Sequence, residues 1–185
     1  DTDRSRGLGD VYKRQDFLFI TLQYEMCYTN VLQALDLAGI PLHAVERTGE
    51  DPIVIGGGPC TYNPEPIAPF FDLFYIGEGE VVYDQLFDTY LENKKNGGTR
   101  LDFLKKACRI PGIYVPQFYE VTYHEDGTVA AFTPSIPEAP EKIKKQLVMD
   151  MTEATYPEKP VVPFIKATQD LSLIHISEPT RPISI

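Results

Sequence analysis

Two glycine-rich loops contain the residues whose types and spacing are best suited to binding a ligand. The first loop comes directly after an apolar run that ends at Ile55, and it contains Gly56, Gly57, Gly58 and Pro59. The second loop reads YIGEGE and contains Gly77, Glu78, Gly79 and Glu80. Glycines let a ligand approach the backbone closely and expose amides that can meet a phosphate or amide oxygen. The carboxylates can accept hydrogen bonds from a hydroxyl or an amide, so both loops are candidate ligand-binding loops.

Each loop also has a purely structural explanation. Tight strand–helix turns use glycines without any ligand, and Asn63 and Glu65 after the first loop could cap a short helix. Glu78 and Glu80 could likewise cap the next helix and meet its positive end. The first loop lacks the third glycine of the GxGxxG fingerprint, and no GK[ST] follows as in a Walker loop. Acid–base catalysis by the paired carboxylates is not expected, because no partnered nucleophile or base is visible.

The elements that would position these loops alternate between strand and helix. Apolar runs predict strands at Phe17–Leu22, Pro52–Ile55 and Leu73–Ile76, and helical spacing predicts helices at Asn30–Ala38, Pro64–Phe71 and Glu80–Lys95. This alternation is typical of a parallel α/β sheet, in which ligands bind at the carboxyl ends of the strands. Thr21 and Gln23, after the first strand, would then face the same crevice as the glycine loops.

The pattern changes after Gly98. A helix is predicted at Leu101–Ala107 and a short strand at Ile113–Val115. A hairpin is predicted from Phe118–Tyr123 and Val129–Phe132, with Asp-Gly in its turn. The proline-rich stretch 134–163 reads as an extended connector to another domain. We therefore divide the sequence into an α/β segment at 16–98 and a small α+β segment with connector at 99–170.

Composition limits the classes of partner. The formal net charge of −10 argues against a phosphate backbone as the main partner, so nucleic acid binding is not expected. No apolar run approaches the length of a membrane span, so no membrane partner is expected. Cys27, Cys60 and Cys108 lie far apart with no CxxC or CxxxCxxC spacing, which predicts free thiols in a reducing cytoplasm and no metal site in this chain. The sequence does not indicate an oligomeric state.

The two ends of the chain are expected not to be native protein sequence. The segments SRGLGDVYKRQ, at 5–15, and LSLIHISEPTR, at 171–181, can be encoded by opposite strands of one DNA sequence. That DNA resembles a transposase-type sequencing-library adapter read through at both ends of an insert. We therefore expect 1–15 and 171–185 to be adapter-derived and exclude them from fold reasoning.

Three segments follow one another along the chain: FITLQYEMCYTNVLQALDLAGIPL, IVIGGGPCTYNPEPIAPFFDLFYIGEGE and IPGIYVPQFYEV. Taken together, their order resembles the N-terminal region of B12-binding-domain radical SAM proteins. The resemblance implies a partial flavodoxin-like, Rossmann-like parallel sheet that holds cobalamin, the corrinoid cofactor, at its carboxyl edge. Residues implied to line that site are Thr21, Leu22, Gly56, Gly57, Gly58, Pro59, Gly77, Glu78, Gly79 and Glu80.

The resemblance further implies a radical SAM barrel after Asp170, whose CxxxCxxC would bind a [4Fe–4S] cluster that cleaves S-adenosylmethionine. The chain would then be a fragment of a radical SAM enzyme and inert alone. One alternative is a non-catalytic binding or scaffold domain that has lost its cofactor. Another is an unrelated Rossmann-like enzyme that binds a nucleotide at the glycine loops, which is less attractive because no acidic ribose-binding residue follows a third strand.

Overall fold

A computed structural model describes residues 15–150 and Thr152 of the chain. Apart from Gln15, the two segments expected to be adapter-derived lie outside the described residues, as does the connector beyond Thr152. Among the described residues, no helix is long and apolar enough to cross a membrane.

The described residues form a four-stranded sheet with the order β1-β2-β3-β4. Its strands are β1 at Phe17–Thr21, β2 at Ile53–Gly57, β3 at Leu73–Tyr75 and β4 at Ile113–Tyr114. β1 runs parallel to β2 with Phe17 opposite Ile53, β2 runs parallel to β3, and β4 is antiparallel to β3. The predicted α/β class with a partial Rossmann-like parallel sheet is therefore confirmed for β1 to β3, and the antiparallel β4 makes the sheet mostly rather than wholly parallel.

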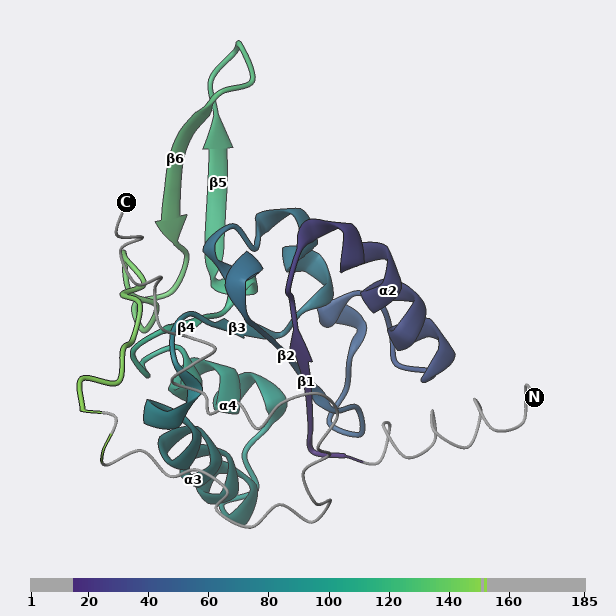
Figure 1. Cartoon of the computed structure of the whole chain (residues 1–185), viewed down its shortest axis with the longest axis vertical. Helices are drawn as coiled ribbons and strands as arrows, with labels where there is room; N and C mark the ends of the chain where they lie inside the picture. Colours follow the sequence, from purple (N-terminus) through teal and green to yellow (C-terminus); the bar gives the residue numbers. More distant parts are fainter. Residues whose placement is uncertain (1–14, 151, 153–185) are drawn as a thin grey trace, which may run out of the picture. The chain divides into compact units, whose positions relative to one another are not determined.

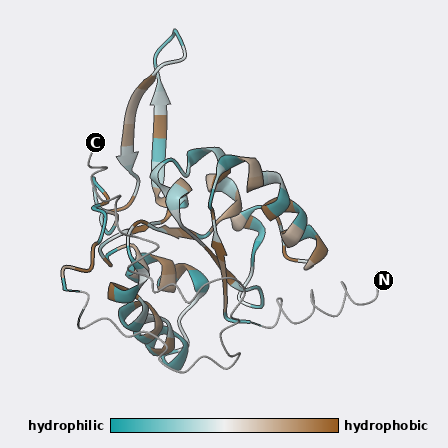
Figure 2. Cartoon of the chain, viewed as in Figure 1, coloured by the Kyte–Doolittle hydropathy of each residue, from teal (hydrophilic) through white to brown (hydrophobic). Residues whose placement is uncertain are grey.

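Helices cover both faces of this sheet (Figure 1). One core cluster contains Ile53, Ile55 and Leu73 with side chains of α3, at Tyr83–Lys95, and α4, at Arg100–Ala107. The other contains Val54 and Phe74 with side chains of α2, at Tyr28–Leu37. Neighbouring strand residues enter opposite clusters, as the period of two of a β-strand requires. The strands are consequently apolar on both faces, and Figure 2 shows hydrophobic residues in the central strands of the sheet.

Prolines decide the form of the segment that follows the first glycine loop. The segment predicted as a helix at Pro64–Phe71 is a 3-10 helix at Glu65–Phe70, preceded by a second 3-10 helix at Pro59–Tyr62. Pro66 and Pro69 have no backbone N–H, so a regular α-helical ladder cannot form there. Neither 3-10 helix has a side-chain cap, so the capping role considered for Asn63 and Glu65 is wrong.

Residues on both sides of Gly98 share one core. β4 extends the sheet of β1 to β3, and Phe103 and Leu104 of α4 are buried in the same cluster as Leu86 of α3. α4 begins with a capping box, in which the Thr99 side chain accepts from the Asp102 backbone amide and the Asp102 side chain accepts from that of Thr99. The predicted hairpin is present as a separate two-stranded sheet of β5, at Tyr119–Tyr123, and β6, at Val129–Pro134.

A buried ion cluster ties the core together next to β2 and β3. The Asp72 carboxylate, 2% exposed, accepts from Arg47 Nη1 at 2.8 Å and from the Val54 amide at 2.7 Å. Arg100 Nη2 lies 2.7 Å from the same carboxylate. Arg47 also donates to the carbonyls of Pro41, Leu42 and Phe70. Burial lowers the pKa of Arg47, which the nearby carboxylate opposes. No simple sequence pattern pointed to this cluster.

Candidate functional site at the carboxyl edge of the sheet

A hollow of about 130 Å³ lies at the carboxyl ends of the parallel strands. Six of the predicted site residues line it: Thr21, Gly56, Gly57, Gly58, Gly77 and Gly79. The sheet thus brings together one residue after β1 and both glycine loops, as expected for the carboxyl edge of a parallel sheet. Whether these residues contact a ligand stays a prediction.

The other predicted site residues lie outside this hollow. Leu22 is fully buried, and its carbonyl accepts from the Cys60 amide at 3.1 Å. Pro59, Glu78 and Glu80 are exposed and do not line the hollow. Gln23, expected to face the crevice, is exposed as well. Glu78 precedes a 3-10 helix at Gly79–Val81 without capping it.

Aromatic side chains form a wall of the hollow that the sequence motifs did not indicate. Phe19 from β1 and Tyr83 from the first turn of α3 both line it, with ring centroids 6.0 Å apart in an edge-to-face arrangement. They are 45% and 44% exposed. The alternation of β1 was the available signal: Phe19 lies two residues before Thr21, so both side chains point to the same face of the sheet.

The glycines of the hollow are already in close contact with the chain's own atoms. A Cβ at Gly56 would collide with the Phe74 ring, and one at Gly79 would collide with the Tyr83 phenol. Gly58 has φ +93°, and a Cβ there would lie 2.9 Å from the Leu22 carbonyl oxygen. These three glycines are therefore required by packing whether or not a ligand binds.

Gly57 differs from the other glycines of the hollow. Among the described residues other than its two chain neighbours, no atom lies within 4 Å of the position that its Cβ would occupy, although its carbonyl accepts from the Leu22 amide at 2.7 Å. The backbone of Gly57 therefore faces open space, where a small ligand could approach it.

The connector meets the second glycine loop and closes one side of it. Gln146 accepts from the Glu78 amide at 3.1 Å and donates its own amide to the Ile76 carbonyl at 3.1 Å. A Cβ at Gly77, where φ is +142°, would collide with the Gln146 backbone. The Glu78 side chain accepts from the Val148 amide. Gly77 and Glu78 thus hold the connector, a role that their sequence motif did not reveal.

The titratable groups around the hollow do not form a catalytic pair. Tyr75 lines the hollow and donates to the Glu78 carbonyl at 2.7 Å. Burial raises the pKa of Tyr75 to about 12, so the phenol stays protonated near neutral pH and does not act as a base. The described residues contain no group of three His, Cys, Asp or Glu side chains that could hold a metal ion.

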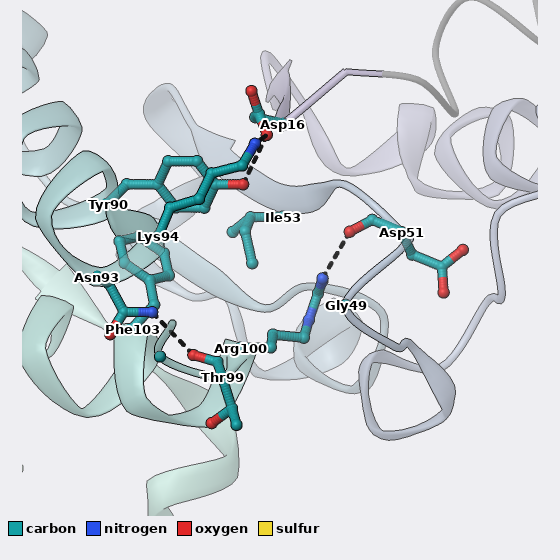
Figure 3. A pocket seen from close by; sticks show the side chains of 11 residues that line it. Asp16, Gly49, Asp51, Ile53, Tyr90, Asn93, Lys94, Thr99, Arg100 and Phe103 are labelled. Carbon is teal, nitrogen blue, oxygen red and sulfur yellow. Dashed lines mark hydrogen bonds and ion pairs between the residues drawn. The ribbon is translucent and has the colours of Figure 1, made fainter. Parts of the chain in front are cut away.

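A second hollow of about 190 Å³ lies at the opposite, amino-terminal ends of the strands (Figure 3). Lys94 Nζ and the Tyr90 hydroxyl each donate to Asp16 at 2.7 Å, and Arg100 donates to the Asp51 carbonyl at 2.8 Å. Hydrogen bonding to Lys94 lowers the pKa of Asp16. These charged groups pair with one another and join α3 and α4 to the starts of β1 and β2. We interpret this hollow as structural.

The carboxyl-edge hollow of the described residues is too small to enclose a corrinoid, and the chain lacks the ligand spacing of an iron–sulfur cluster. Pockets for drug-sized ligands measure about 300–1,000 Å³, and a corrinoid is larger than such ligands, whereas the carboxyl-edge hollow measures about 130 Å³. The three cysteines are free, two of them buried, and no cluster-binding spacing joins them. This chain therefore does not provide the ligands of an iron–sulfur cluster.

Comparisons with known proteins place more than half of the chain in one family. Residues 8–116, more than half of the chain, match the family model described as "Radical SAM proteins, N-terminal". The chain is also similar to the uncharacterized protein MJ0966 of Methanocaldococcus jannaschii, with 39% identity over 72 residues. That alignment covers 38% of this chain and 15% of the relative, so the chain spans only a small part of the relative's length. No solved structure matches.

Proposed function

Because the chain belongs to the family of radical SAM proteins, N-terminal, we propose that it is a fragment of a radical SAM enzyme and forms its N-terminal α/β domain. The family implies a parent that uses S-adenosylmethionine and a [4Fe–4S] cluster. The family match carries this proposal. In this proposal the cluster ligands lie in another region of the parent, because the chain itself has no CxxxCxxC spacing. Free thiols also suit a cytoplasmic parent.

The first experiment is to amplify the source DNA outward from both ends of the insert and sequence it. We expect native codons in place of the adapter-like ends and a CxxxCxxC motif soon after Asp170. The extended protein, reconstituted with iron and sulfide and reduced, should then cleave S-adenosylmethionine to 5′-deoxyadenosine. A reading frame that stops near Asp170, or that continues without such a motif, would contradict the proposal.

A finer form of the proposal is that the complete domain binds cobalamin at the carboxyl edge. The convergence of Thr21 and both glycine loops on one hollow supports this form. It requires the hollow to widen beyond its present volume. Gly57 is the position where a ligand would approach the backbone, because the space beside it is open. Titrating the extended protein with hydroxocobalamin and following its visible absorption tests this form. Gly57→Val should weaken binding if the corrinoid lies against Gly57.

The second candidate function is a cofactor-free domain that serves protein contact, and two observations favour it. The hollow is smaller than a corrinoid requires, and Gly56, Gly58, Gly77 and Gly79 all pack against atoms of the chain itself. Under this candidate, the extended protein still cleaves S-adenosylmethionine but neither binds hydroxocobalamin nor responds to Gly57→Val. The two outcomes of the titration therefore separate the candidates.

A further inference from the structure

The free edge of β1 presents unpaired backbone groups. β1 pairs with β2 on one side, and no other strand of the described residues pairs with it. The Asp16 carbonyl accepts from the Ile53 amide, and the Leu22 amide donates to the Gly57 carbonyl. Hydrogen bonding alternates along a strand, so the backbone N–H and C=O groups of the even-numbered β1 residues point toward β2. The N–H and C=O groups of Phe17, Phe19 and Thr21 therefore point away from the sheet.

An apolar stripe on α3 lies beside this edge. Tyr83, Phe87 and Leu91 are spaced four residues apart, so they lie along one line of the helix. They are 44%, 36% and 60% exposed, which is unusual for a row of large apolar side chains. The Phe19 ring lies 6.0 Å from that of Tyr83 and 6.2 Å from that of Phe87, which joins the stripe to the edge strand.

A row of acidic side chains borders the apolar stripe. Asp84, Asp88 and Glu92 each follow a stripe residue by one position, and all three are exposed. Lys94, on the same helix, is already paired with Asp16 at 2.7 Å. The face formed by the β1 edge and the α3 stripe is therefore apolar at its centre and negative along one border.

We propose that this face, defined by Phe17, Phe19, Thr21 and the stripe Tyr83, Phe87 and Leu91, binds an extended β-strand of a partner. The strand carries apolar side chains on its α3-facing side and basic residues at its flanks. The unpaired amides and carbonyls require an extended backbone, because only a strand matches their spacing. The stripe selects apolar side chains on alternate residues, and the acidic row selects the basic flanks.

A second copy of the chain does not meet this description. Pairing β1 with its own symmetry mate would bring two α3 acidic rows to the same interface, and like charges there are destabilising. The net charge of −10 acts in the same direction.

The test uses the full chain, labelled with ¹⁵N, and a short amidated peptide. The peptide has alternating valine and threonine over the length of β1, with a pair of lysines at each end. We expect the peptide to slow exchange of the Phe17, Phe19 and Thr21 amides, which pair with no other strand of the described residues. Amides of Leu18 and Ile20 are already bonded to β2 and should change little.

Two altered peptides separate the contribution of the backbone hydrogen bonds from that of the charged flanks. N-methylation of the valines blocks the backbone hydrogen bonds and should abolish the protection. Replacing the lysines by glutamates should weaken binding about fivefold or more, since two or more exposed charge pairs are lost. The double variant Asp84→Lys, Asp88→Lys should reverse the preference between lysine and glutamate peptides. Asp36→Lys, on the exposed side of α2, is the matched control and should leave the preference unchanged.

Several results would overturn the proposal. One is peptide binding without protection of the Phe17, Phe19 and Thr21 amides, and another is equal binding of the lysine and glutamate peptides. Sedimentation that shows the chain dimerising through this edge, with Phe87→Glu making it monomeric, would assign the face to a second copy. The absence of any peptide binding to a folded chain would remove the face as a docking site.

Discussion

Replacing Asp72 by asparagine is expected to destabilise the chain by about 3 kcal/mol. The substitution keeps the shape of the side chain and one carbonyl oxygen, so the hydrogen bond from the Val54 amide can survive. It removes the negative charge opposite Arg47 and Arg100, whose side chains are 0% and 12% exposed. Breaking a buried ion pair from one side leaves an uncompensated charge in the core, which costs about 3–5 kcal/mol.

The lower end of that range applies here because both guanidiniums keep other acceptors. Arg47 retains the carbonyls of Pro41, Leu42 and Phe70, and Arg100 retains those of Asp51 and Pro52. For a chain of this length, about 3 kcal/mol corresponds to a fall in Tm of about 6–12 °C.

Urea unfolding followed by circular dichroism measures the effect. The matched control is Asp16→Asn, which removes a carboxylate from the exposed ion pair with Lys94 and should cost no more than about 1 kcal/mol. If Asp72→Asn destabilises the chain no more than Asp16→Asn does, the buried cluster does not contribute as argued.

Three further predictions concern single positions. Gly77→Ala should destabilise the folded chain by about 1–3 kcal/mol and expose the connector to proteolysis, because φ is +142° and a Cβ would collide with Gln146. Gly57→Ala is the control and should change Tm little. Equal changes in Tm for the two variants would refute this. Because burial raises the folded-state pKa of Tyr75 to about 12, its contribution to stability should be complete below pH 10 and lost as pH rises from about 10 to about 12. The difference in 295 nm absorbance between wild type and Tyr75→Phe reports that titration, and a midpoint near 10 in folded protein would contradict it. Thr99→Ala should cost about 1 kcal/mol in urea unfolding by removing the α4 capping box, an effect that a valine at the same position should reproduce.

The alternation of strands and helices was predictable because it depends on local patterns of apolar and turn-forming residues. The runs at Phe17–Leu22 and Leu73–Ile76 are apolar apart from Thr21, as is typical of buried parallel strands, and Gly97 and Gly98 mark the end of α3. The pairing of β4 with β3 was not predictable, because its two residues, Ile113 and Tyr114, are too short to show a period and their partner is distant in sequence.

The candidate site was predictable in its position and only partly in its chemistry. Parallel strands bring the residues after β1, β2 and β3 to one edge, so the meeting of Thr21 with the glycine loops follows from topology. The partners of Gly77 and Gly79 could not be read from the sequence, because they depend on contacts with Gln146 and Tyr83 that no local rule specifies. A glycine that packs against its own chain looks the same in sequence as one that faces a ligand.

The bridge between Gly77 and Gln146 makes the connector a mechanical link to the edge of the sheet. Two backbone hydrogen bonds join Gln146 to Ile76 and Glu78, in the loop directly after β3. A pulling force on the chain beyond Gln146 must either displace this loop or break both bonds. Displacing the loop moves Gly77 and Gly79, which form part of the wall of the hollow. A force applied to the connector at Gln146 is therefore borne by the same loop that forms part of the wall of the hollow.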